Sequence, residues 1–420
     1  MSRILEMAFP ARLGTRFRWL MASSWVSNIG DGIALAAGPL LVASMTRDPI
    51  LVAMAGLLQR VPWLLFGLPA GAIADRLDRR LTVAIADMLR AGVLALLTIM
   101  ILADSLNIWL VLATMFVLGT AETFADTASQ TLMPMLVDKA DYGVANARLM
   151  GGFITANQLA GPPIGALLFA AGMALPFASQ AVLAALGALL VVRIAFPPVV
   201  HSQEHGHHIG RDIVEGLQWL WGNPPVRTLT LTIVTFNVTY GAAWSVLVLY
   251  AIERLRIGEV GFGLLTTATA VGGLVATVSY GWLEQRFRLA LLMRGCLLVE
   301  TVTHLVLATT TIDMVAFVTL FFFGIEAFVW GTTSRSVRQR AVPMDFQGRV
   351  GSVYMIGVIG GIVVGGILGG LIASWWGITA PFWFGFVGSA VMLAVIWREL
   401  AKIAHADEET RVLEVQVIPV

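Results

Sequence analysis

Six of the ionisable side chains inside long apolar stretches of the sequence are candidates for proton binding: Asp31, Glu122, Asp126, Glu300, His304 and Glu326. A charge at the centre of a membrane-spanning helix costs about 2.5–3.5 kcal/mol on insertion scales. A carboxyl group in apolar surroundings favours its neutral form, so it can load and release a proton as its access to water alternates. The sequence therefore predicts proton binding, with Asp31, Glu122 and Glu326 as the main candidates.

Ion pairing is the alternative role for the acidic groups of the first half. Asp87 and Arg90 stand one helical turn apart, so they could neutralise each other. Arg60 could pair with Asp31 or hold an anionic substrate. Asp126 lies nearer a helix end and could pair with arginines of the adjoining loop. Both roles stay open at this point.

The second half offers the same two alternatives. Glu300 and His304 are one turn apart on one predicted helix face, so they could form a local pair. Glu326 lies in the next apolar run and is the rough counterpart of Glu122 in the first half. Either group could instead bind a proton.

Polar and aromatic side chains in the apolar runs could line a greasy cavity for an amphiphilic molecule. The candidates are Asn28, Arg60, Asn157, Phe236, Tyr240, Trp244 and Trp330. Aromatic residues more often pack against neighbours or lie at a membrane interface, which is the alternative for each aromatic member.

The elements that would hold these residues are membrane-spanning helices. The chain has 420 residues, of which 58% are hydrophobic and 13% charged, and its mean hydropathy is +0.82. Apolar runs of about 20 residues recur, the length that crosses a bilayer, and within lipid such runs must be helical. We expect an all-α polytopic protein with these spans: 17–44, 50–74, 81–103, 107–130, 142–170, 174–196, 226–251, 261–284, 289–310, 313–334, 349–374 and 377–398.

Charge and polarity divide the chain further. Of its 27 Lys and Arg residues, about 21 fall on one side of these spans, which predicts a bacterial inner-membrane protein with both termini cytoplasmic. We expect an N-terminal bundle of six helices over 1–196 and a C-terminal bundle of six over 226–398. A cytoplasmic linker with an amphipathic helix covers 197–225, and 399–420 forms a cytoplasmic tail.

The two halves resemble each other at an offset of roughly 205–210 residues. Gly71 and Gly281 each precede basic residues, and Pro134 and Pro343 each precede a glycine-rich span. Two pseudo-symmetric bundles are typical of a transporter with its substrate site at the midplane. In the second glycine-rich span, glycines every four residues predict close packing on a neighbouring helix.

The stretch GAIADRLDRR, at 71–80, resembles the loop between spans 2 and 3 of the major facilitator superfamily. The matching positions are Gly71, Asp75, Arg76, Arg79 and Arg80, and Asp78 stands where that motif usually has glycine. With Asp at this position, the motif resembles that of the branch that contains enterobactin exporters, macrolide-efflux proteins and multidrug-efflux proteins. The resemblance implies a major facilitator fold, and charge pairs at this loop that break and remake during transport. Plain positive-inside topology is the alternative.

The stretch NQLAGPPIGA, at 157–166 within the fifth span, partly resembles the antiporter motif of exporters in the same superfamily. Gly161, Pro162 and Gly165 match, whereas Asn157 and Ala166 replace two of its glycines. The resemblance implies export in exchange for protons. Physically, the two glycines form a small-residue groove and the proline loosens the helix.

Other function classes lack their motifs in this sequence. There is no GxxxxGK[ST] phosphate loop, HExxH or GxSxG, so we expect neither an enzyme nor an ATP-driven pump. The single cysteine excludes an internal disulfide, and we expect no cofactor, no metal site and no nucleic acid partner. We predict a proton-coupled exporter of small hydrophobic or amphiphilic compounds, drugs or a natural product such as a siderophore, for which a monomer suffices. The alternatives are uptake of a small nutrient and a non-transporting scaffold.

Overall fold

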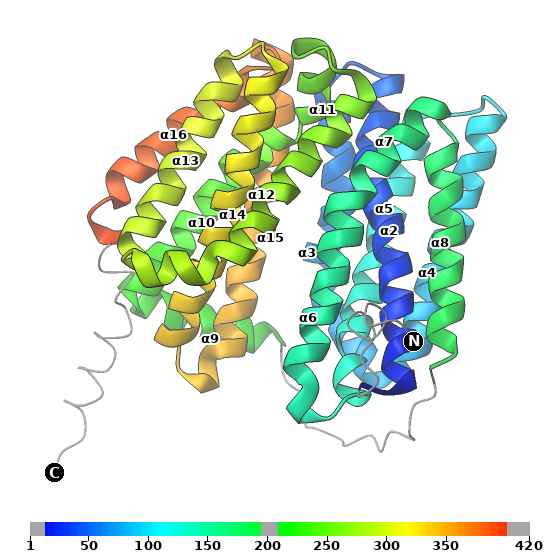
Figure 1. The fold of residues 1–420 in the computed structure, drawn as a ribbon, viewed down its shortest axis with the longest axis horizontal. Coiled ribbons are helices and arrows are strands. Elements are labelled where there is room, and N and C mark those ends of the chain that lie inside the picture. Colours follow the sequence, from blue (N-terminus) through cyan, green and yellow to red (C-terminus); the bar gives the residue numbers. More distant parts are fainter. Residues whose placement is uncertain (1–12, 195–208, 401–420) are drawn as a thin grey trace. The chain divides into compact units, whose positions relative to one another are not determined.

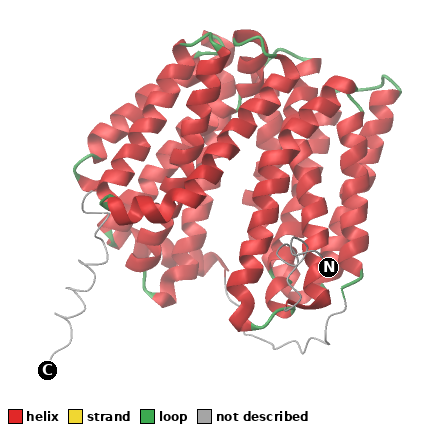
Figure 2. Cartoon of the chain, viewed as in Figure 1, coloured by secondary structure: helices red, strands yellow, loops and turns green. Residues whose placement is uncertain are grey.

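The computed structural model describes residues 13–194 and 209–400, and within these ranges it contains helices and connecting loops without strands (Figure 2). Of the predicted linker, only residues 197–208 lie outside these ranges, whereas the predicted C-terminal tail lies outside them from residue 401 onward. Contacts divide the chain into two units, Met1–Gln203 with Ala251–Thr267 and Glu204–Tyr250 with Ala268–Val420.

Between residues 13 and 194, the first unit contains eight α- or π-helical segments. They are α2 (Gly14–Met45), α3 (Pro49–Arg76), α4 (Arg79–Leu102), α5 (Ile108–Gln130), α6 (Tyr142–Gly152), η4 (Phe153–Ala160), α7 (Gly161–Ala171) and α8 (Leu175–Val192) (Figure 1). Short 3₁₀ turns, η2 (Met133–Met135) and η3 (Lys139–Asp141), precede α6.

Polar residues stand where three of these helices begin. Asp48 and Asn107 accept hydrogen bonds from the Ile50 and Trp109 amides, at 2.9 and 2.8 Å, and so cap α3 and α5. Asp78 caps α4 in the same way. A side-chain acceptor here satisfies amides that have no partner inside the helix.

The second unit contains α9 (Ile209–Gly222), α10 (Pro224–Trp244), α11 (Leu247–Leu249), α13 (Leu289–Thr309), α14 (Asp313–Ala341), η6 (Met344–Phe346), α15 (Gln347–Trp376) and α16 (Ala380–Ile396). The short π-helical turn η5 (Tyr250–Arg254) and α12 (Gly258–Arg286) run across the boundary between the units. The close packing predicted for the second glycine-rich span is confirmed, since Cβ atoms at Gly361, Gly365 or Gly369 would collide with the backbone of α10.

In the described ranges, nine helices are long and apolar enough to cross a membrane, and α10 with its bent continuation makes a tenth. Two predicted spans need a physical explanation. The fifth is divided into α6, η4 and α7 because Pro162 and Pro163 lack amide protons and interrupt the regular hydrogen-bond ladder. The twelfth, α16, has 17 residues and is about one turn short of a typical span. The predicted all-α polytopic fold is confirmed.

Candidate functional site

Arg90 joins two helices of the first unit through two carboxylates. Its Nη1 donates a hydrogen bond to Asp87 Oδ1 at 3.1 Å on α4, and its Nη2 donates one to Asp31 Oδ1 on α2. The side chains of Arg90, Asp87 and Asp31 are 5, 3 and 15% exposed. Burying charges is unfavourable unless they are paired, so each carboxylate depends on the same guanidinium.

Two further carboxyl groups, both on α5, interact with Asp31 and Arg90. Glu122, partly buried, interacts electrostatically with Asp31, Arg90 and the exposed side chain of Arg60 on α3. Asp126, one turn along α5 and more exposed, interacts with Asp31 and Arg90. We call Asp31, Asp87, Glu122 and Asp126, together with Arg90, the acidic cluster.

In the acidic cluster, carboxyl groups outnumber guanidinium groups. If all of its carboxyl groups were ionised, one guanidinium would face four negative charges. Arg60 contributes only at the edge, because it is exposed. Like charges at short range disfavour one another, and bound protons or cations relieve that repulsion.

The helix break of the fifth span lies against the residue that follows Asp31. A Cβ on Gly161 would collide with the backbone of Gly32, and one on Gly165 would collide with that of Ile33. Asn157 is 8% exposed, and its carbonyl oxygen lies where a Cβ on Gly32 would fall. The small residues of this segment therefore let α7 and η4 contact α2 at the acidic cluster.

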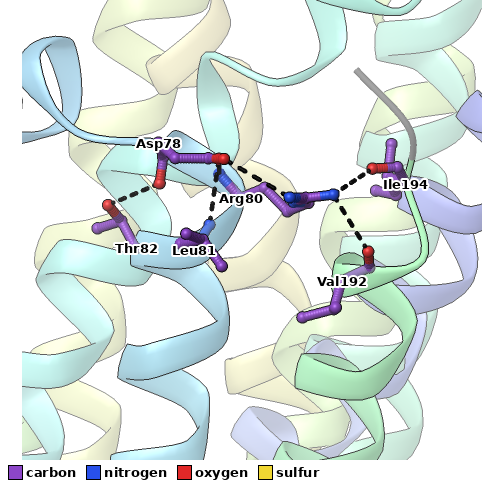
Figure 3. A network of polar contacts seen from close by, with 6 residues as sticks. All are labelled: Asp78, Arg80, Leu81, Thr82, Val192 and Ile194. Atoms are coloured by element: carbon purple, nitrogen blue, oxygen red, sulfur yellow. Dashed lines mark hydrogen bonds and ion pairs between the residues drawn. The ribbon is translucent and has the colours of Figure 1, made fainter.

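The loop motif at 71–80 acts as a helix junction at the beginning of α4. Asp78 Oδ1 accepts hydrogen bonds from the amides of Arg80, at 2.9 Å, and Leu81, at 3.3 Å (Figure 3). Arg80 Nη1 donates to the carbonyl oxygens of Val192, at 3.4 Å, and Ile194, at 3.1 Å, at the end of α8. The motif therefore ties the beginning of α4 to the end of α8.

The remaining positions of the motif contribute differently. Arg79 Nη1 contacts the Met135 sulfur at 3.3 Å. A Cβ on Gly71 would meet nothing within 4 Å among the described residues, so no close contact there requires a glycine. The side chains of Asp75 and Arg76 lie outside the described part of the chain, so the predicted charge pairs of the loop stay a prediction.

In the second unit, buried carboxyl groups face each other from α13 and α14. Glu300 is 6% exposed and Glu326 is 4% exposed, and the two interact electrostatically. Within the described ranges neither forms an ion pair. His304 Nδ1 lies 2.9 Å from the backbone carbonyl oxygen of Glu300, so the histidine contacts the main chain of the expected partner. We call Glu300 and Glu326 the carboxyl pair.

Aromatic rings lie beside the carboxyl pair. Tyr240 and Trp244 on α10 have ring centres 4.5 Å apart, and Phe323 on α14 lies 5.9 Å from Tyr240 and 4.5 Å from Trp244. The Trp244 ring meets His304 edge-on at 6.2 Å. The aromatic group therefore lies one helical turn from the carboxyl pair, through His304 on α13 and Phe323 on α14.

Three of the predicted cavity residues have local structural roles. Phe236 and Trp330 are 3 and 5% exposed and belong to the hydrophobic core of the second unit. Asn28 donates a hydrogen bond of 2.7 Å to the Ser24 carbonyl of its own helix. Core packing therefore accounts for the two aromatic residues.

Comparison with known proteins assigns the chain to a family. A family model described as "Transmembrane secretion effector", of the major facilitator type, matches residues 9–416. The chain belongs to this family.

Relatives of this chain include efflux proteins. It is 28% identical over 361 residues to "Multidrug efflux pump Tap" of Mycolicibacterium fortuitum, covering 81% of this chain and 84% of that protein. It is 23% identical over 268 residues to "Macrolide efflux protein A" of Streptococcus pyogenes, covering 63% and 66%. The predicted resemblance to the efflux branch of the major facilitator superfamily is confirmed, and the chain is a multi-pass membrane transporter of that branch.

Solved structures of other transporters share the fold of this chain. A point mutant of the nucleoside transporter NupG superimposes with a TM-score of 0.76 at 13% identity, covering 92% of this chain and 100% of that one. A bacterial homologue of the iron transporter ferroportin, in an inward-facing state, gives 0.71 at 17% identity, covering 93% and 98%. At these identities the likeness shows the fold alone.

Sequence reasoning missed two features of the site. It offered Arg60 either as a partner for Asp31 or as a ligand for an anionic substrate, whereas Asp31 pairs with Arg90. It also treated Asp78 as a departure from a motif, although an Asp directly before a helix is a recognised capping signal. That signal could have identified Asp78 from the sequence, whereas nothing local indicated the contact between α2 and α4.

Proposed function

We propose that this chain exports small hydrophobic or amphiphilic compounds in exchange for protons. The observation that carries the proposal is the acidic cluster, in which Asp31 on α2 shares the Arg90 guanidinium with Asp87 while Glu122 and Asp126 stand nearby. A transporter that couples two fluxes needs a group whose charge changes as access alternates, and a surplus of carboxyl groups over cations supplies one.

In this proposal, a proton bound by Asp31 or Glu122 changes how strongly α2 is held to α4. When Asp31 is ionised, its charge attracts Arg90; when it is protonated, that attraction weakens and Asp87 retains the guanidinium. Because α2 also contacts α7 through Gly32 and Gly161, the proton state of the cluster bears on a helix contact at the antiporter motif. This links proton binding to helix movement.

The substrate class is proposed from two supports. The relatives are named for efflux of multiple drugs and of macrolides. The aromatic rings of Tyr240, Trp244 and Phe323, beside the carboxyl pair, suit flat or amphiphilic molecules that carry an amine, since such rings attract cations. We also propose that both termini are cytoplasmic, following the distribution of basic residues.

Energy from protons is sufficient for such export. Moving one charge through roughly 150 mV supplies about 3.5 kcal/mol, which corresponds to a concentration ratio of a few hundred-fold for a neutral substrate.

Transport into inside-out membrane vesicles tests the proposal. Cells that express the chain give vesicles whose lumen can be acidified, and uptake of a radiolabelled macrolide is followed with and without an ionophore that collapses the proton gradient. Proton-coupled export predicts accumulation only while the gradient stands. Accumulation that survives collapse of the gradient, or macrolide entry into right-side-out vesicles driven by an acidic exterior, would overturn it.

A further inference from the structure

A groove of about 500 Å³ runs between α13 and α16, both within the second unit. Its sides are mostly apolar, with Leu298 on α13 and Ala394 and Val395 on α16, and Trp397 and Arg398 stand at one end. The two helices lie side by side at the edge of their unit (Figure 1). The groove is therefore mainly apolar, with Thr301 as a neutral polar residue in its wall and the charged Arg398 at the end where α16 stops.

The walls of the groove belong to an apolar helix surface that the other described residues leave exposed. Val387, Val391 and Val395 recur every four residues along α16 and are 55, 59 and 71% exposed. Leu298 and Val302 on α13 are 49 and 46% exposed. In a multi-pass membrane protein, exposed apolar side chains on a spanning helix contact acyl chains, so an acyl chain is the natural occupant of the apolar part.

The polar end contains two arginines with different roles. Arg294 Nε and Nη2 donate to the Trp397 carbonyl oxygen at 3.0 and 2.7 Å, and its guanidinium lies 4.9 Å from the centre of the Trp397 ring. Arg294 therefore caps the end of α16.

Arg398, in contrast, does not cap a helix. It is exposed, and no hydrogen bond or ion pair ties it to another side chain in the described ranges. A guanidinium can hold a phosphate through two parallel hydrogen bonds, and tryptophan is enriched at the headgroup level of membranes.

We propose that this groove binds one phospholipid with an anionic headgroup, its acyl chain lying along Leu298, Ala394 and Val395 and its phosphate on Arg398. The charge of Arg398 and the adjoining Trp397 select the headgroup, while the apolar walls hold the tail. The site concerns α13 and α16 only, and it stands whether or not the transported compound and the coupling ion are those proposed above.

Native mass spectrometry of the purified full chain tests the site. The protein in detergent is titrated with phosphatidylglycerol or with phosphatidylcholine of the same acyl chains, and the lipids retained after gas-phase activation are counted. Arg398→Gln removes the headgroup contact, and Ala394→Phe fills the groove without changing charge. Arg340→Gln, on an exposed arginine that contacts Ser336 of its own helix, and Ala113→Phe, on the exposed face of α5, are the matched controls.

The expected result is preferential retention of one phosphatidylglycerol by the unaltered chain, with a several-fold loss in both groove variants and none in the controls. Since Arg398 is exposed, its replacement leaves core packing intact, and the unfolding midpoint of the same samples checks this. Equal retention of the two lipids by the unaltered chain, or groove variants that match their controls, would overturn the proposal.

Discussion

Asp31 on α2 accepts a hydrogen bond from Arg90 on α4, a residue that also holds Asp87 one turn away on its own helix. The guanidinium is therefore shared between two carboxylates inside the first unit. Removing Arg90 leaves two buried carboxylates without their cation, whereas removing one carboxylate leaves the guanidinium paired with the other, so the first change should destabilise the protein more.

Replacing Arg90 should destabilise the protein severely. Arg90→Met leaves Asp31 and Asp87 without their cation, and breaking a buried pair from one side costs about 3–5 kcal/mol. The unfolding midpoint in detergent measures the effect. Arg47→Met is the control, because Arg47 and Glu253 are 3.9 Å apart and 58 and 38% exposed, and such pairs contribute at most about 1 kcal/mol. Equal midpoints for the two variants would show that Arg90 does not hold the cluster together.

Replacing glycine by alanine should lower the stability at Gly161 on α7 but not at Gly151 on α6. Gly161→Ala places a Cβ against the Gly32 backbone, and such overpacking costs about 1–3 kcal/mol. Gly151→Ala adds a Cβ where nothing lies within 4 Å, and alanine is favoured over glycine in a helix by about 0.5–1 kcal/mol. Midpoints of thermal unfolding should fall for the first and stay level or rise for the second. A neutral Gly161→Ala would mean that α2 and α7 are not in close contact.

The capping role of Asp78 predicts a graded series. Asp78→Ala removes the acceptor for the amides of Arg80 and Leu81 and should cost about 1 kcal/mol, whereas Asp78→Asn keeps an acceptor and should cost much less. Hydrogen exchange at the first turn of α4 reports the local effect. If Asp78→Ala and Asp78→Asn raise hydrogen exchange at this turn equally, Asp78 does not stabilise α4 by capping it.

The carboxyl pair should tolerate neutral isosteres. Glu300 and Glu326 form no ion pair with a cation in the described ranges, so Glu300→Gln or Glu326→Gln breaks no ion pair and should change the stability by less than about 1 kcal/mol. Glu215→Gln is the contrasting variant, because it breaks a 3.2 Å ion pair with Arg349 that anchors α9 to α15. A strong loss of stability in both pair variants would indicate that each carboxylate is held by a cation or donor.

The sequence predicted the features that depend on composition and short-range spacing. The helical spans follow from apolar runs, and the ion pair of Asp87 with Arg90 follows from their one-turn separation. The family resemblance rested mainly on the consecutive residues at 71–80 and is confirmed by the match over residues 9–416.

The features that escaped sequence reasoning depend on which helices meet. Asp31 and Arg90 are 59 positions apart, and no local pattern distinguishes Arg90 from Arg60 as the partner. The prolines at 162 and 163 indicate a break in the fifth span, but the π-helical form of residues 153–160 depends on how α2 packs against them. The partner of Asp31 and the form of the fifth span therefore depend on contacts between helices, which spacing along the sequence does not predict.

The central claim is that the acidic cluster carries the coupled proton, and comparison of two transport modes in proteoliposomes tests it most directly. Asp31→Asn and Glu122→Gln are measured for exchange of labelled macrolide between equal pools and for uphill accumulation driven by a pH gradient, with Asp104→Asn, on the exposed turn after α4, as the control. We predict that at least one of the two single variants, and the double variant, keeps exchange. Its accumulation ratio should fall at least about tenfold, equivalent to about 1.4 kcal/mol. Full pH-driven accumulation by the double variant would contradict the claim.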